Sequence, residues 1–206
     1  MADRVSIDDG EADTAVIAEY EVSRRALVRR GIAVGSLSLA AASIPALLRV
    51  RNAFAQADDD RAIIEKAVGL EQTAVFAYAA AVASGKLDAR TTQVAELFGR
   101  HEQEHAGALT AALKTLGGTA PPKPSRPGDV SGLAAAAASA RGILNFAIAF
   151  EESAVAAYYD ASQKLKDAKL LTAGSSIMAN EGQHLVVLRQ AARLNPVPTA
   201  FATGKA

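Results

Sequence analysis

An internal repeat constrains the fold of this sequence more than any other feature does. Residues 70–78 read LEQTAVFAY, and the related stretch FEESAVAAY follows at residues 150–158. HEQEH at residues 101–105 is matched by NEGQH at residues 180–184. Each copy therefore supplies one glutamate and, about 30 residues later, the pattern E-x-x-H. A chain that repeats itself in this way is expected to build two similar structural units.

The hydrophobic pattern predicts four long helices, at residues 58–84, 88–116, 131–166 and 167–194. The first two are expected to end at glycines, the third to be capped by Ser131, and the fourth to end at Asn195-Pro196. The stretch TAPPKPSRPGDV at residues 119–130 has four prolines and is not expected to be helical. The predicted fold class is therefore all-α: an antiparallel four-helix bundle of two helical hairpins joined by a long Pro-rich crossover.

Composition supports a helical fold and excludes several kinds of function. Half of the 206 residues are hydrophobic, and alanine, the best helix former, is common. The absence of cysteine excludes disulfides, thiolate metal sites and cysteine nucleophiles. The formal net charge is zero, so we expect no nucleic-acid partner.

Six polar residues of the repeat interrupt apolar stripes near the middle of the predicted helices and should face the core. A buried carboxylate is costly unless it is paired or bound to a metal. Four glutamates would balance the charge of two divalent cations, and oxygen and nitrogen ligands favour iron or manganese. We therefore predict a site for two Fe or Mn ions, with these ligands: Glu71, Glu102, His105, Glu151, Glu181 and His184.

HEQEH also allows a different interpretation, as the zinc helix H-E-x-x-H of a metalloprotease with Glu102 as general base. That interpretation requires His101 as a ligand, but the repeat has Asn180 at the equivalent position. The element that repeats is E-x-x-H, so the repeat favours the two-metal site. His101 is then expected to be solvated or to support a ligand from outside.

Three more residues are expected near the ligands. Tyr78 and Tyr158 lie two turns from the lone glutamates on the same helix faces, so each is expected to pack there and hydrogen-bond a ligand carboxylate. Glu152 competes with Glu151 for the ligand role, but it aligns with Gln72 of the first copy. We therefore expect Glu151 to be the ligand and Glu152 to be a supporting group.

The N-terminal residues have the pattern of an export signal. Residues 1–22 are acidic and are expected to be a disordered leader. Residues 23–55 hold a basic segment with paired Arg24 and Arg25, an apolar segment, and an A-x-A sequence that predicts cleavage after Ala55. We expect the twin-arginine machinery to export the protein to the periplasm or the cell exterior. The alternative is an uncleaved N-terminal membrane anchor.

Because of these six predicted ligand residues, the chain resembles the ferritin-like superfamily. With its export signal, it resembles exported bacterial ferritin-like domain proteins in particular. The expected bundle domain covers residues 56–195, and residues 196–206 are expected to form an irregular tail. The resemblance implies a di-iron or di-manganese centre that oxidises Fe(II) or consumes peroxide or dioxygen, with no catalytic residue beyond the metal ligands. The alternative is a non-catalytic metal-binding or stress-related structural protein of the cell envelope. Small residues on the helix faces would allow a homodimer.

Overall fold

The computed structural model describes residues 59–204, and within them it contains only helices and loops, with no strand. The long helices are α3 (Asp60–Ala83), α4 (Ala89–Thr115), α6 (Ala140–Ser162) and α7 (Ala168–Ala191). The short ones are the 3₁₀ helix η2 (Pro127–Asp129) and α5 (Leu133–Ala136). The predicted all-α class is confirmed for this part of the chain. The predicted leader and export signal, with Arg24, Arg25 and Ala55, lie outside the described residues.

Three of the long helices begin at an aspartate that caps the first turn. The Asp59 carboxylate accepts a hydrogen bond from the Ala62 amide at 2.7 Å, and Asp88 does the same at the start of α4. Asp167 accepts from two amides at the start of α7. Aspartate is favoured at this position because its side chain satisfies amides that have no partner inside the helix. These caps place the helix starts close to the predicted boundaries.

The third long helix begins later than the sequence pattern predicted. We expected Ser131 to cap a helix running to about residue 166, but α6 begins at Ala140, with Ser139 as its cap. Gly132 adopts a left-handed conformation with φ 85°, so no helix continues through it from Ser131, and only the four-residue α5 follows. The backbone then becomes extended at Ser139, with φ −152° and ψ 153°, before α6 begins. The Ser139 hydroxyl then accepts a hydrogen bond from the Gly142 amide at 3.0 Å.

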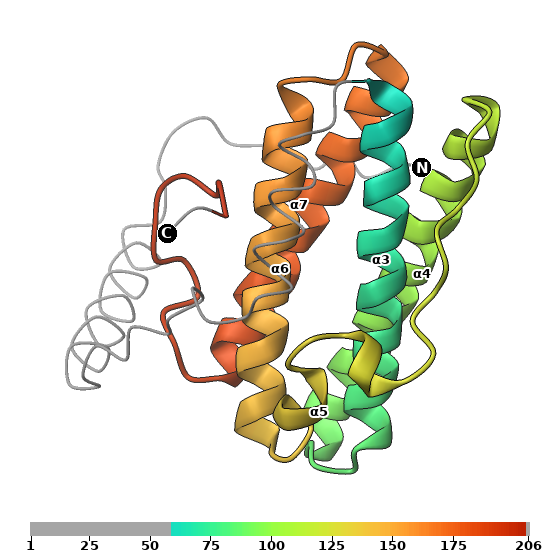
Figure 1. Cartoon of the computed structure of the whole chain (residues 1–206). Coiled ribbons are helices and arrows are strands. Elements are labelled where there is room, and N and C mark those ends of the chain that lie inside the picture. Colours follow the sequence, from blue (N-terminus) through green and yellow to red (C-terminus); the bar gives the residue numbers. More distant parts are fainter. Residues whose placement is uncertain (1–58, 205–206) are drawn as a thin grey trace, which may run out of the picture. The chain divides into compact units, whose positions relative to one another are not determined.

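The four long helices run side by side, with α3 packed against α4 and α6 packed against α7 (Figure 1). Short connections at residues 84–88 and 163–167 join the helices of each pair. The Asp60 carboxylate accepts hydrogen bonds from the Lys166 and Asp167 amides at 2.9 and 2.8 Å, so the start of α3 is fixed to the turn between α6 and α7.

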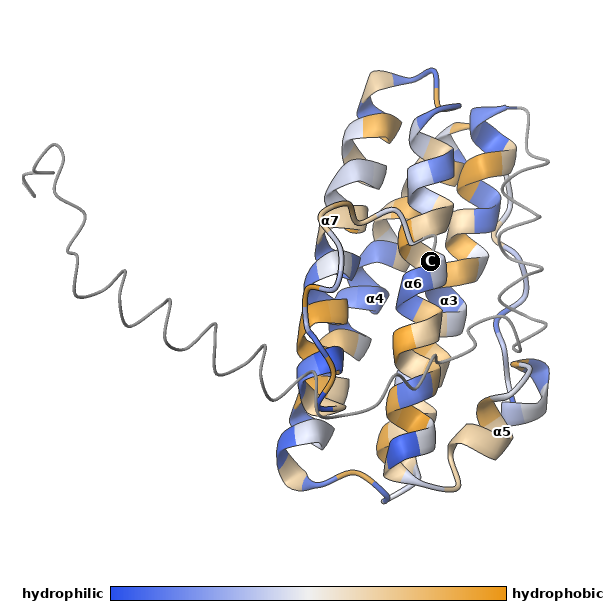
Figure 2. Ribbon diagram, turned by 90° about the vertical axis from the view of Figure 1, so that its left-hand side faces the viewer, coloured by the Kyte–Doolittle hydropathy of each residue, from blue (hydrophilic) through white to orange (hydrophobic). Residues whose placement is uncertain are grey.

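All four long helices contribute to the hydrophobic core. Val68, Leu109, Phe150 and Ile177 come from one helix each and belong to the same buried cluster. Hydrophobic residues are distributed along every long helix and are not concentrated in one segment (Figure 2). Within residues 59–204, every helix is too short or too polar to span a membrane.

The position of the α6 cap can be tested with two serine variants. Ser139→Ala should lower the free energy of unfolding by about 1 kcal/mol, because the Gly142 amide loses its partner. Ser131→Ala, in an exposed turn, should change it by less than about 0.5 kcal/mol. Urea unfolding of the full chain followed by circular dichroism measures both. A larger effect at Ser131 would support the helix start predicted from the sequence.

Candidate metal centre

The structure brings the six predicted ligand residues together in the middle of the four long helices. Glu71 lies on α3, Glu102 and His105 on α4, Glu151 on α6, and Glu181 and His184 on α7. Five of the six side chains are at most 1 % exposed, and His105 is 14 % exposed. Carboxylates buried this deeply have no contact with bulk water. Other protein groups or bound cations must therefore stabilise them.

The six residues form two groups that share Glu102 and Glu181. In the first, His105 Nδ1 lies 3.4 Å from Glu71 Oε2, 3.4 Å from Glu102 Oε2 and 3.1 Å from Glu181 Oε1. In the second, His184 Nδ1 lies 3.2 Å from Glu102 Oε1, 3.3 Å from Glu151 Oε1 and 3.1 Å from Glu181 Oε2.

The shared glutamates turn different oxygens to the two groups. Glu102 and Glu181 each place one oxygen beside His105 and the other beside His184. Glu71 contributes to the first group alone, and Glu151 to the second alone. Each shared glutamate could therefore offer one oxygen to each of the two groups.

Most of the converging atoms lack a hydrogen-bond partner. Their separations lie within hydrogen-bonding distance, but their directions do not suit hydrogen bonds. A buried polar atom without a partner costs about 1–3 kcal/mol, and a cation bound in each group would supply the missing partners. The donor set therefore fits divalent metal ions. The unpartnered atoms are Glu102 Oε1, Glu151 Oε2, both Glu181 carboxylate oxygens, and Nδ1 of His105 and His184.

The pKa values of the four glutamates divide them into two kinds. Burial raises the pKa of Glu71 and of Glu151 well above the ordinary value, which favours their neutral forms. Burial would also raise the pKa of Glu181, but the two histidines outweigh it and lower the value to about 2. The pKa of Glu102 is lowered for the same reason. The shared glutamates are therefore the anionic pair.

The two histidines carry the opposite charge. Burial alone would lower their pKa values, but the three carboxylates around each imidazole outweigh it. The pKa of His105 rises to about 12 and that of His184 to about 11. Without a bound cation, these directions favour two imidazolium groups facing two carboxylates and two neutral carboxyls, an arrangement that carries no net charge.

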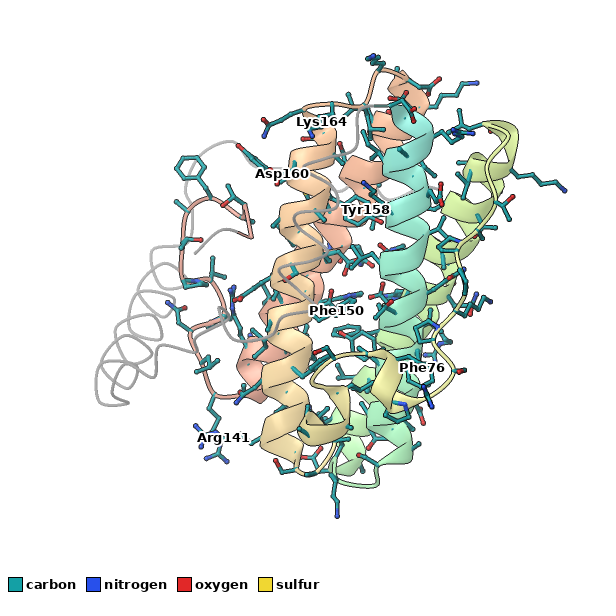
Figure 3. The ribbon with its side chains drawn as sticks, in the orientation of Figure 1. Phe76, Arg141, Phe150, Tyr158, Asp160 and Lys164 are labelled. Atoms are coloured by element: carbon teal, nitrogen blue, oxygen red, sulfur yellow. The ribbon has the colours of Figure 1, made fainter. Side chains whose placement is uncertain are left out.

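Two tyrosines link the halves of the repeat at this centre. The Tyr78 hydroxyl donates a hydrogen bond to Glu151, and the Tyr158 hydroxyl donates one to Glu71. Figure 3 shows Tyr158 between the helices, directed from α6 towards α3. Burial raises the pKa of both hydroxyls well above 10.0, so both keep their protons and act as donors. Each tyrosine orients the lone glutamate of the other copy.

His101 and Phe98 lie against His184; a supporting place for His101 beside a ligand was one of the two expected from the sequence, whereas the contact of Phe98 with His184 was not expected. His101 Nδ1 lies 3.0 Å from His184 Nε2, and the Phe98 ring stacks on the His184 ring with centroids 3.9 Å apart. His101 belongs to neither ligand group, which does not fit the zinc-helix interpretation of HEQEH. The sequence repeat already set His101 apart from the ligands, because the second copy has Asn180 at the equivalent position.

Glu152 lies away from the centre. Its carboxylate pairs with Arg189 at 2.6 Å, and its side chain is 26 % exposed. The structure therefore brings together the six predicted ligands and both tyrosines, but not Glu152.

A family model described as a ferritin-like domain matches residues 21–194. This match covers most of the chain, and the chain belongs to the ferritin-like domain family. Comparisons with curated proteins and with solved structures found no match.

A double-mutant cycle can test the contact between the two halves. Tyr78→Phe and Glu151→Gln should show a coupling free energy of about 1–3 kcal/mol, because the two side chains share a buried hydrogen bond. Tyr78→Phe and Glu152→Gln serve as the matched control, with a coupling within about 0.5 kcal/mol of zero. Chemical unfolding of the three single variants, the two double variants and the parent gives both values. Equal coupling in the two cycles would contradict the assigned partner.

Proposed function

We propose that this chain is an exported ferritin-like protein that binds a di-iron or di-manganese centre and uses it to oxidise Fe(II) or to consume peroxide or dioxygen. The observation that carries the proposal is the pair of shared glutamates, Glu102 and Glu181, whose two oxygens lie beside different histidines. Ion pairing alone does not require this division. Glu102 and Glu181 would each be able to hold two cations through oxygens divided in this way.

The proposal includes the topology of the bundle: two antiparallel helical hairpins joined by a long Pro-rich crossover. The packing of α3 with α4 and of α6 with α7 supports it, as does the sequence repeat. The 24 residues between α4 and α6 (116–139) contain no long helix and carry the prolines. In such a bundle, each hairpin contributes the same ligands from facing helices.

The residues present would hold two metals in similar positions. Glu71 and His105 would bind one ion, Glu151 and His184 the other, and the shared glutamates would bridge them. Two divalent cations carry four positive charges, which match four ionised glutamates. The ligands are oxygens and imidazole nitrogens, which suit iron and manganese.

When bound as Fe(II), two metals supply one electron each, which with two protons reduces one peroxide to two waters or one dioxygen to one peroxide. The protein's own groups hold and orient the ligands and keep bulk water out. The Tyr78 and Tyr158 hydroxyls fix the lone glutamates, and the surrounding apolar side chains keep the centre buried. None of these residues acts as a nucleophile.

Metal content is the direct test. The protein purified from its native compartment should contain about two Fe or Mn ions per chain by elemental analysis. Glu71→Ala and Glu151→Ala should each remove about one ion, because each residue belongs to one group alone. Glu152→Ala is the matched control and should keep the full content, because its carboxylate pairs with Arg189.

The same samples separate the alternatives. Turnover of ferrous iron or peroxide by the loaded protein supports the oxidoreductase function. Two metals without turnover would favour a non-catalytic metal-binding protein whose bundle the metal stabilises. One zinc per chain that depends on His101 would instead support the metalloprotease interpretation. A folded protein with no metal would favour the structural role in the cell envelope.

We further propose export by the twin-arginine route, on the strength of the segment SRRALVRR at residues 23–30 and the apolar residues after it. Changing Arg24 and Arg25 together to Lys should retain the protein inside the cell with its leader intact. Arg29 and Arg30 changed to Lys form the matched control and should leave export normal. Fractionation and immunoblotting measure both. Normal export of the first variant would contradict this route.

A further inference from the structure

An apolar cavity of about 30 Å³ lies beside the candidate metal centre. Ala74, Ala147 and Leu188 line its inner part. Each of them stands three or four residues along its own helix from a predicted ligand. That spacing is about one helical turn, or roughly 5 Å along the axis. The inner end of the cavity therefore adjoins the layer of ligands.

The outer part of the cavity lies near the connection between α3 and α4. Leu87, Thr91, Val94 and Leu144 line it there, and each of them is partly exposed. The cavity thus extends from partly exposed residues towards buried ones. It offers a route from the solvent side of the bundle to the centre.

The walls of the cavity offer almost no hydrogen-bonding groups. Apart from Thr91 at the outer part and Tyr78 at the inner part, every lining side chain is aliphatic or phenylalanine. The Tyr78 hydroxyl already donates its hydrogen bond to Glu151. Figure 3 shows Phe150, one of the lining residues, in the middle of the bundle. An apolar cavity of this kind stays free of ordered water.

We propose that this cavity holds dioxygen and admits it to the metal centre. The proposal rests on the proposed function and selects one oxidant among those it leaves open. A single water needs roughly 10–15 Å³ on the same measure, so the cavity has room for a diatomic molecule. Pockets for larger organic ligands run to roughly 300 Å³ or more. Dioxygen is small and apolar, and its transfer from water into apolar surroundings is favourable.

The same walls disfavour the other reactants. Hydrogen peroxide carries two hydroxyl donors and several acceptor lone pairs, which lose their water partners on entry and find none in the walls. A hydrated Fe(II) ion would lose far more hydration free energy on entry, because the wall offers no charge or ligand oxygen to replace its water shell. The cavity therefore discriminates by polarity, and any ion or peroxide must reach the centre elsewhere.

The test of the cavity itself uses xenon, an apolar atom that reports on dioxygen-sized sites. Crystals of the full chain pressurised with xenon should show density in the cavity, with or without metal. Ala77→Leu, on the buried face of α3, should fill the cavity and abolish that density. Ala79→Leu is the matched control, because Ala79 is exposed on the same helix. Ala147→Val provides a second filled variant should Ala77→Leu fail to fold.

The test of admission uses the metal-loaded protein and two oxidants. Ala77→Leu should raise the KM for dioxygen in Fe(II) oxidation several-fold, whereas Ala79→Leu should not. With peroxide as oxidant, both variants should match the parent. An unchanged KM for dioxygen in Ala77→Leu, or no xenon density in the parent, would overturn the proposal. Xenon density in a loaded protein that oxidises nothing would refute the proposed redox function and leave dioxygen-sized binding supported.

Discussion

The burial of four glutamates in one helical core is the constraint on which the rest of the structure depends. Isolated carboxylates would destabilise such a core by several kcal/mol each. As protein groups alone, they are tolerated because Glu71 and Glu151 are held neutral and two imidazolium groups face the remaining pair. Two divalent cations would take the place of the four protons this arrangement holds, since metal ligands must be deprotonated. Both states are electrically balanced, so the same helices can accommodate either one.

The repeat makes the ligands symmetric but leaves their surroundings asymmetric. Each lone glutamate receives a hydrogen bond from the tyrosine of the other copy. The surroundings of the two histidines differ. The His184 side chain is 1 % exposed and the Phe98 ring stacks on it, whereas the His105 side chain is 14 % exposed. A ligand nitrogen nearer to solvent sits in a more polar environment. Two metals bound here would therefore differ in access and in redox behaviour although their ligands are the same.

Sequence patterns were sufficient for the features that repeat or that depend on local chemistry. The repeat identified the six side chains that converge in the core, and Asp88 and Asp167 lie where the helices were expected to start. The late start of α6 depends on the extended backbone at Ser139, after the short helix α5 that follows the left-handed Gly132, and the run of alanines at residues 134–138 conceals this break. The partner of each tyrosine, the place of His101 beside His184 and the pairing of Glu152 depend on how the two halves pack. One sequence without its fold does not contain that information.

The cavity arises from the alanine content that also allows the helices to pack closely. Larger aliphatic side chains at Ala77 or Ala147 would fill the space and gain contacts, since voids in a core cost free energy. Several of the residues that line this space, which are apolar except for Thr91 and Tyr78, stand about one helical turn from the predicted ligands. Tyr78, which hydrogen-bonds Glu151, is among the residues that line the cavity. Its position links the packing of the bundle to the chemistry proposed for the centre, because a small apolar oxidant can use a path that water and ions cannot.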